Sequence, residues 1–526
     1  MKKSLRSLLL ATALVTVSYS AAFAEMIYNR GNSADPESLD PHKTSTVYEA
    51  HILRDLFSGL VMQDAKADVI PGAAESWKMS DDGTVYTFSL RKGATWSNGD
   101  PVTADDFVYS FRRLEDPATA AEYASMLYVV KNAQEINEGK AKLEELGVKA
   151  VDANTLEITL KSPTPYFLEM LTHQANYPVH KASIEKLGAD WIKPGNLVSN
   201  GAYTLAEFVP NDHIKLVKNP KYYEADQVKV DVVNYFPTED RSTAIKRFEA
   251  GELDSNDDMP LEQLADLKAK FGDQVRIGPY LGTYYYAVKL DKEPWSNPKL
   301  RRAISMAIDR DFLAEKVWGN SMLPGYSMVP PGIAGYEPAI ADYAEMSQID
   351  REDEAKKILT ELGYGPDKPL KLEIRYNTSE NHKNTAVAIQ EQLKPLGVEV
   401  TMVNTDTKTH YGHLEQKGDF DYARAGWIAD YKDPETFLGI SRKASGNNYS
   451  DFNNPKYEEL MDKAAAAGGD PAERSKILSE AERVLVDDLG NMPLLYYSYH
   501  NLVSPKLKGY EDNVMDVHPT RFISKE

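Results

Sequence analysis

Strand and helix patterns alternate along the whole of this 526-residue chain, and this alternation restricts the fold more than any other feature. Residues 371–376 and 398–403 read as strands on either side of a helix over 380–396, which predicts a β-α-β unit with parallel strands. Residues 200–217 predict an antiparallel hairpin that turns near Asn211. Parallel and antiparallel strands mixed with helices predict an α/β protein with mixed sheets.

Several helices carry start and stop signals. Thr103 is the expected N-cap of a helix that begins at Ala104. A longer helix is expected with Asn297 as its N-cap, Pro298 at its first position and Gly319 after its end. Further strands are expected over 85–90, 228–236 and 284–290, a helix over 239–250, and a long ordered connection over 322–338.

The first 24 residues have the pattern of a cleaved secretory signal peptide. Three basic residues precede an apolar run over 8–17, and Ala22-Phe23-Ala24 gives a cleavage site before Glu25. No later segment approaches about 18–20 consecutive apolar residues, the length of a membrane-spanning helix. The chain has no cysteine, which excludes both disulfides and a lipid-anchored cysteine. We therefore expect a soluble protein of a Gram-negative periplasm.

Size and charge restrict the classes of function. The mature chain would have 502 residues, enough for about three domains of roughly 150 residues each or for two large lobes. The leader carries three basic and no acidic residues, so the mature net charge is −23 rather than −20. A charge of this sign repels nucleic acid and disfavours anionic membrane surfaces.

The sequence offers little that resembles an active site or a metal centre. The usual nucleophile, zinc-protease and nucleotide-binding motifs do not occur. His410 and His413, with Glu415 nearby, offer possible metal ligands, although exposed loop histidines are the more common case. Asp257 and Asp258 are a possible carboxylate pair for glycoside hydrolysis, but a solvated acidic turn is the default interpretation. We expect no metal, no cofactor and a binding protein rather than an enzyme.

Residues 419–438, DFDYARAGWIADYKDPETFL, carry the most specific charge pattern. They begin as a strand in which Arg424 lies among apolar and aromatic residues, and Asp430 follows where the strand ends. A partly buried guanidinium needs a carboxylate or several acceptors. Two interpretations stay open: an internal ion pair that fixes one loop, or an ionic anchor for a small charged ligand.

Six segments together resemble one known family. They are SLDPHKTSTVYEAHILRDLFSGLV (38–61), PGAAESWKMSDDGTVYTFSLRKGATWSNGDPVTADDFVYSFRR (71–113), NGAYTL (200–205), PYLGTYYYAVKL (279–290), RYNTSENHKNTAVA (375–388) and ARAGWIADY (423–431). The chain resembles the periplasmic oligopeptide-binding proteins of bacterial ABC importers, within extracellular solute-binding protein family 5. The resemblance covers essentially the whole mature chain.

The resemblance implies a two-lobed periplasmic-binding-protein fold with a hinge between the lobes and an extra inserted domain. Domain I would comprise 25–57, 180–280 and 498–526, with the inserted domain II over 58–179 and domain III over 281–497. The chain would cross between lobes near 280 and 497. Tyrosine runs lie at both crossings, at 280–286 and 496–497, and are expected to line the cleft.

The resemblance also implies how a peptide would bind. Asp430 would pair with the ligand α-ammonium, with Arg424 close by, and the ligand backbone would add as a strand beside Thr46-Val47 and Gly426-Trp427. The full set of expected ligand-binding residues is Thr46, Val47, Tyr123, Asp257, Asp258, Tyr280, Tyr285, Asn377, His382, Arg424, Gly426, Trp427, Asp430 and Tyr497. The expected partners are a peptide and the inner-membrane ABC permease, with the protein itself a monomer outside the membrane.

Departures from the family pattern affect the rest of the site. Enteric relatives carry a disulfide between the cleft strands, where this chain has Gly282 and Ile428. Lys408 and Glu415 stand where those relatives have a tryptophan and a second arginine, and Asp257-Asp258 replaces paired asparagines. We therefore expect a changed preference for length or charge, favouring basic or modified peptides such as cell-wall peptides. Alternatives are a non-peptide solute, such as a metal chelate or an opine, and a secreted hydrolase.

Overall fold

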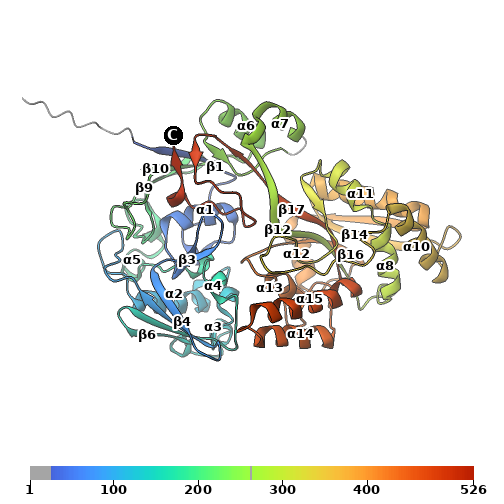
Figure 1. Cartoon of the computed structure of the whole chain (residues 1–526), viewed down its shortest axis with the longest axis horizontal. Coiled ribbons are helices and arrows are strands. Elements are labelled where there is room, and N and C mark those ends of the chain that lie inside the picture. The colour runs from blue at the N-terminus through green and yellow to red at the C-terminus, as the bar shows by residue number, and fades with distance from the viewer. Residues whose placement is uncertain (1–24, 261–262) are drawn as a thin grey trace, which may run out of the picture.

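Two long strands, β12 (Val275–Val288) and β17 (Asn491–Val503), run through both lobes of the molecule (Figure 1). They belong to a computed structural model that describes residues 25–260 and 263–526, so the predicted signal peptide lies outside the described residues. The two strands pair antiparallel, with an irregularity in register between Pro279 and Thr283. The chain crossings expected near 280 and 497 fall within these strands.

Among the described residues, one sheet of eleven strands extends through both lobes. One end of the sheet is the parallel pair β15–β14 and the other is the antiparallel pair β9–β8. Between them, β1 and β10 pair parallel, whereas β12 pairs antiparallel with both β16 and β17. Besides β12 and β17, its strands are β15 (Val398–Thr405), β14 (Leu370–Asn377), β16 (Tyr422–Ile428), β11 (Ser255–Asn256), β1 (Ile27–Asn32), β10 (Val232–Pro237), β9 (His213–Lys218), β8 (Tyr203–Val209) and β13 (Met322–Pro324).

A second, four-stranded sheet lies within the segment expected to form the inserted domain. Its antiparallel strands are β4 (Ala74–Met79), β5 (Val85–Leu90), β7 (Thr155–Thr159) and β6 (Val148–Asp152). Two small strand pairs complete the sheets: β2 (Val61–Gln63) with β3 (Val69–Pro71), and β18 (Leu507–Lys508) with β19 (Ser524–Lys525). The exact domain boundaries stay a prediction.

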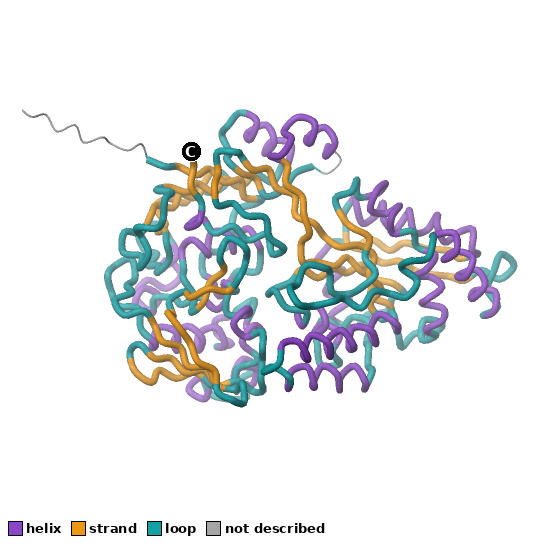
Figure 2. The backbone as a smooth tube through the Cα atoms, viewed as in Figure 1, coloured by secondary structure: helices purple, strands orange, loops and turns teal. Residues whose placement is uncertain are grey.

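Helices surround the strands of both lobes, and in the C-terminal lobe they lie on both sides of the sheet (Figure 2). The N-terminal half contains α1 (Val47–Leu56), α2 (Ala104–Glu115), α3 (Ala133–Asn137), α4 (Phe167–Met170), α5 (Lys181–Leu187), α6 (Arg241–Glu249) and α7 (Leu264–Phe271). The C-terminal half contains α8 (Pro298–Ala307), α9 (Arg310–Phe312), α10 (Gln348–Glu361), α11 (Glu380–Leu393), α12 (Thr407–Glu415), α13 (Glu435–Leu438), α14 (Pro455–Ala466) and α15 (Pro471–Asp488).

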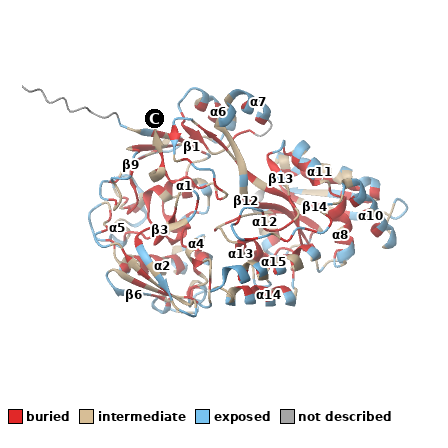
Figure 3. Ribbon diagram, in the orientation of Figure 1, coloured by how far each residue is buried: buried red, intermediate tan, exposed pale blue. Residues whose placement is uncertain are grey.

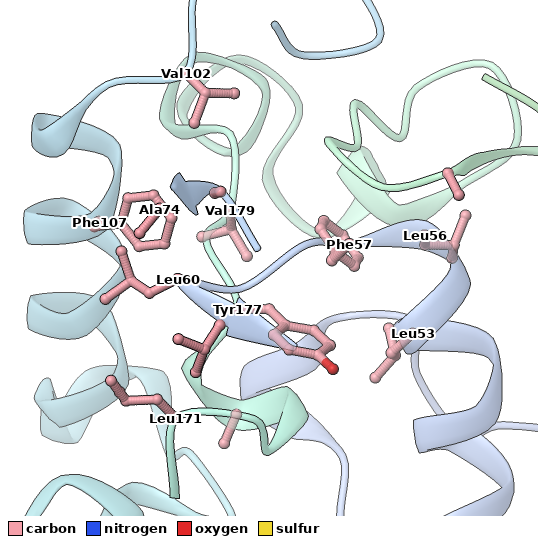
Figure 4. Packing of buried hydrophobic residues seen from close by; sticks show 14 of the residues in the cluster. Leu53, Leu56, Phe57, Leu60, Ala74, Val102, Phe107, Leu171, Tyr177 and Val179 are labelled. Carbon is pink, nitrogen blue, oxygen red and sulfur yellow. The ribbon is translucent and has the colours of Figure 1, made fainter. Parts of the chain in front are cut away.

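Each lobe has its own hydrophobic core. The strands β12, β14, β16 and β17 are mostly buried, whereas α6, α7 and α10 have exposed faces (Figure 3). The N-terminal core joins α1 to the second sheet: Leu53 and Leu56 of α1, Phe57 and Tyr177 pack in one cluster with Phe107 of α2 (Figure 4). Separate clusters lie in the C-terminal lobe. Because α1 packs on this core, its N-terminal end has a fixed position beside the other lobe.

The predicted β-α-β unit, the hairpin and the helix start at Thr103 are confirmed. β14 and β15 are parallel across α11, β8 and β9 are antiparallel, and the Asp106 carboxylate accepts a hydrogen bond from the Thr103 N–H at 2.7 Å. The single helix expected from 297 to 319 is wrong: α8 ends at Ala307. The Asp309 carboxylate accepts from the Phe312 N–H at 2.9 Å and so caps a new helix, α9.

The expected two-lobed α/β fold with mixed sheets is thus confirmed. Within residues 25–260 and 263–526, no helix has both the length and the apolar character needed to cross a membrane.

Candidate functional site

A cavity of about 670 Å³ lies between the lobes. Its walls come from α1 and the residues before it, from β12 and β17 where they cross, and from the end of β16 with the loop that follows. In Figure 1, α1 and β16 stand in different lobes. Nine of the expected ligand-binding residues line it: Thr46, Val47, Tyr123, Asp257, Asp258, Tyr280, Trp427, Asp430 and Tyr497.

The first wall is the N-terminal end of α1. Thr46 is its N-cap, and its own N–H and hydroxyl donate to the Glu49 carboxylate at 3.1 and 2.7 Å. This capping box uses the Thr46 N–H, so that group is already bonded. Val47 is 58% exposed although apolar, and Arg54 lines the same wall two turns further along the helix.

The second wall is the C-terminal half of β16. This strand pairs with β12 from Tyr422 to Ile428, but with β14 only at Tyr422 and Ala423. In the described structure, the other edge of Gly426–Ile428 therefore has no neighbouring strand, and an extended ligand can pair there. Gly426 also leaves room for the Tyr497 hydroxyl, which would lie 2.8 Å from any Cβ at that position.

Asp430 follows β16 and faces the cavity without a counter-charge. The described residues place no cation within ion-pair distance of its carboxylate and supply no side-chain hydrogen bond to it. Burial raises the pKa of Asp430 to about 7. The hydroxyls of Tyr123 and Tyr280 lie within electrostatic range of it. The alternative of an internal Arg424–Asp430 ion pair is therefore not realised here.

Arg424 is satisfied instead by neutral groups. It is 8% exposed and donates to the hydroxyls of Tyr411 at 2.7 Å and Tyr497 at 2.8 Å, and to Asn377 Oδ1 at 3.3 Å. Its guanidinium carbon lies 4.9 Å from the centre of the Tyr284 ring. No carboxylate of the described residues pairs with it. Arg424 lies behind Tyr497 and reaches the cavity through that tyrosine.

Three further expected residues lie behind the cavity wall. Tyr285 is buried in a core of the C-terminal lobe, and its tyrosine neighbours Tyr284 and Tyr286 pack in a second core there. His382 is buried, and burial lowers its pKa to about 3, so it is neutral at pH 7. Asn377 contacts Arg424 rather than the cavity. Their roles in binding stay predictions, as do those of the lining residues.

Asp257 and Asp258 each form ion pairs within the protein. The interpretation as a solvated turn is therefore wrong for Asp257. Its carboxylate accepts from Arg30 Nη2 at 3.1 Å and contacts His51 Nδ1 at 3.1 Å. Although burial opposes it, Arg30 lowers the pKa of Asp257 well below its usual range. Asp258 is more exposed and pairs with Arg241 at 2.7 Å. The partners are far away in sequence, which explains the misreading.

The His410–His413 segment is also not an exposed loop. Both residues lie on α12, and His410 is fully buried, with its Nε2 2.8 Å from the Arg424 carbonyl oxygen. Within the described ranges no group of three or more suitable ligands could bind a metal ion.

The Lys408 side chain lies outside the described residues. Glu415 lines a second cavity, of about 530 Å³, that shares Tyr123, Trp427 and Asp430 with the first.

Gly282 and Ile428 are direct cross-strand partners of β12 and β16. This is the position at which the family resemblance implies a disulfide in enteric relatives. A Cβ on Gly282 would lie 2.5 Å from Ile428 Cδ1 and 2.8 Å from Tyr497 Cδ2.

The charges that line the first cavity nearly all have partners within the chain. Asp257 pairs with Arg30 and Asp258 with Arg241, while the Asp516 carboxylate accepts a hydrogen bond from Asn501 at 2.6 Å and contacts His518 Nε2 at 2.9 Å. The lining histidines His51 and His173 are neutral at pH 7, because burial lowers their pKa values to about 4 and about 3. Arg54 and Asp430 are the lining charges for which the described residues supply no ion pair. They lie on opposite walls.

A two-lobed α/β protein with a charged cavity between its lobes is a ligand-binding receptor by architecture. The family model "Bacterial extracellular solute-binding proteins, family 5 Middle" matches residues 68–449. The chain therefore belongs to family 5 of the bacterial extracellular solute-binding proteins.

Individual relatives agree in sequence and in structure. The periplasmic oligopeptide-binding protein OppA of Escherichia coli K12 is 42% identical over 485 residues, which cover 91% of this chain and 89% of that protein. The unliganded open form of MppA, a periplasmic murein tripeptide binding protein, matches with a TM-score of 0.84 at 39% identity, over 96% of this chain and 98% of that one. Haemophilus influenzae OppA in complex with RPPGFSPFR matches with a TM-score of 0.80 at 38% identity, over 96% and 99%.

Proposed function

We propose that this chain is a periplasmic receptor that captures oligopeptides between its lobes and delivers them to an inner-membrane ABC permease. The relatives named above are peptide-binding proteins by name, and the match to them extends over nearly the whole chain. In this proposal residues 1–24 direct export, and the mature protein works as a monomer without cofactor, metal or catalysis.

The observation that carries the proposal is the unpaired carboxylate of Asp430 in the cavity between the lobes. A carboxylate that the fold itself leaves without a cation is suited to a ligand cation, and every unmodified peptide carries one at its N-terminus. The open edge of β16 at Gly426-Trp427 lies three to four residues before Asp430. An ammonium on Asp430 and backbone pairing along this edge would bind a peptide with little regard to its side chains.

The remaining predicted residues would complete this site. Thr46 and Val47 would contact the ligand from the α1 wall, and Tyr123, Tyr280 and Tyr497 would enclose it. Asp257 and Asp258 would shape the end of the cavity through their ion pairs. Tyr285, Asn377 and His382 would act indirectly, by positioning Arg424 and Tyr497 from behind. Rotation of the two lobes about β12 and β17 would open and close the site, with ligand favouring the closed form.

Isothermal titration calorimetry with trialanine tests whether Asp430 binds the ligand ammonium. Asp430→Asn should weaken binding at least about tenfold, the equivalent of about 1.5 kcal/mol for a charge-assisted hydrogen bond. N-acetyl trialanine should bind the natural protein just as weakly, and Asp430→Asn should add little to that loss. Equal affinity of Asp430→Asn and the natural protein would contradict the anchor. Mass spectrometry of the recovered peptide should find it uncleaved.

A further inference from the structure

The cavity contains one cation that the protein does not neutralise. Arg54 lies on α1, lines the cavity and is partly buried, and its Nε has no hydrogen-bond partner and is shielded from solvent. The described chain offers it no carboxylate within ion-pair distance. Burial lowers the pKa of Arg54, and the groups that act electrostatically on it are Tyr177, Tyr280, Tyr235 and the like-charged Arg30. A guanidinium in such a place lacks an anion.

The other positive groups of the cavity cannot take this role. Arg241 is already paired with Asp258 at 2.7 Å, and Arg30 lies behind the wall with Asp257. His173, whose ring centre lies 4.7 Å from that of Tyr123, is neutral at pH 7. Burial also lowers the pKa of His500. Among the residues that line the described cavity, Arg54 is therefore the free cation and Asp430 the free anion.

The two free charges face the same ligand space from different lobes. The Tyr280 hydroxyl lies within electrostatic range of both Arg54 and Asp430. Arg54 and Asp430 do not pair with each other, which leaves the space between them for a ligand that carries both signs of charge. α1 belongs to the N-terminal lobe and β16 to the C-terminal lobe (Figure 1).

We infer that Arg54 binds a carboxylate of the peptide whose ammonium is bound by Asp430, so that the ligand's opposite charges connect the two lobes. The inference rests on the proposed function. The carboxylate has two possible sources with the same chemistry: the C-terminus of a short peptide, or an acidic side chain close to the N-terminus. Either source makes Arg54 a specificity-determining residue, and the chain would then select peptides by the spacing between ammonium and carboxylate.

Titration calorimetry with four tripeptides separates these sources. Ala-Glu-Ala and Ala-Gln-Ala differ only in a side-chain carboxylate, and the C-terminal amides of both remove the terminal one. In the natural protein we expect the loss of at least one of the two carboxylates, that of the glutamate side chain or that of the C-terminus, to weaken binding about tenfold, as for one charged hydrogen bond. Arg54→Gln should abolish that difference, and Arg54→Lys should restore part of it.

Two controls separate the inference from the proposed function. Arg247→Gln changes an arginine of α6 that pairs with Glu252 at 3.2 Å and does not line the cavity, so the full dependence on the carboxylate should remain. N-acetylation should weaken binding to Arg54→Gln as strongly as to the natural protein, because the ammonium anchor is intact.

The outcomes are distinct. If Arg54→Gln keeps the natural dependence on both carboxylates, Arg54 is not the anion site, although peptide binding itself would stand. If the natural protein binds none of the four peptides, the proposed function fails and this inference fails with it. The sequence suggested a preference for basic peptides, so tighter binding of Ala-Glu-Ala than Ala-Gln-Ala would favour Arg54 over that expectation.

Discussion

Asp257 and Asp430 lie on walls of the same cavity, but the protein treats their charges in opposite ways. Asp257 is enclosed by Arg30 and His51, both of which contact its carboxylate at 3.1 Å. Asp430 has tyrosine hydroxyls nearby and no cation. The first carboxylate therefore belongs to the fold, and the second is available to a ligand. The comparison teaches that burial of a charge indicates a binding site only where its partner is missing from the chain.

The largest expected effect is the loss of stability when the charge of Asp257 is removed. Asp257→Asn leaves Arg30, which is 1% exposed, without its counter-ion, and should lower the free energy of unfolding by about 3–5 kcal/mol. Urea denaturation measures this. Asp258→Asn is the matched control, because its pair with Arg241 is more exposed and should be worth less than about 1 kcal/mol. Similar losses for both variants would contradict the assignment.

A third buried carboxylate, outside the cavity, distinguishes the effect of burial from that of ligand binding. Glu115, at the end of α2, is fully buried, has no hydrogen-bond partner for either oxygen in the described structure, and is not among the cavity residues. Burial raises its pKa to about 9, above its unfolded value. Its contribution to stability is thus complete below about pH 4.5 and is lost as the pH rises towards 9.

Glu115→Gln should therefore stabilise the protein at pH 8 by about 3 kcal/mol, and much less at pH 4. Thermal or urea denaturation at the two pH values measures the difference. Trialanine affinity should stay the same, because Glu115 does not line the cavity. A variant that is less stable at pH 8 would show that the carboxylate has a partner after all.

The smallest expected effect is the pH dependence of peptide binding caused by Asp430. With a pKa of about 7 in the free protein, Asp430 is mostly protonated at pH 6, and binding of an ammonium favours its ionised form. Peptide binding should release about one proton at pH 6 and almost none at pH 8, and affinity should rise up to about tenfold over that range. Calorimetry in two buffers of different ionisation enthalpy measures the proton release, which Asp430→Asn should remove.

The fold was largely predictable from local patterns and from the family resemblance. The alternation of strand and helix signals predicted mixed sheets, and the resemblance placed Gly282 opposite Ile428, as their register confirms. The error at 297–319 has a local cause: Asp309 caps a new helix inside an otherwise continuous apolar stripe. A capping residue within a helical pattern signals such a break.

The charges of the site were less predictable, because a sequence does not reveal which partners are missing. Arg30 lies 227 positions before Asp257, so their ion pair has no local signature. Arg54 was overlooked because an arginine near the end of an amphipathic helix normally extends into solvent. The expectation that His410 is exposed was wrong for a similar reason: its partner is a backbone group, the Arg424 carbonyl of the next strand. Only the assembled cavity distinguishes Arg54 and Asp430 from the paired charges around them.

The absence of a side chain at position 282 has a chemical consequence. A Cβ there would come within 2.8 Å of the Tyr497 ring, whose hydroxyl accepts a hydrogen bond from Arg424 at 2.8 Å. A covalent link between β12 and β16 at this point would therefore displace the tyrosine that connects Arg424 to the cavity. This chain joins its cleft strands by β-ladder pairing and packing without a covalent bond, and with no cysteine anywhere in the sequence its ligand affinity should be indifferent to thiol reductants.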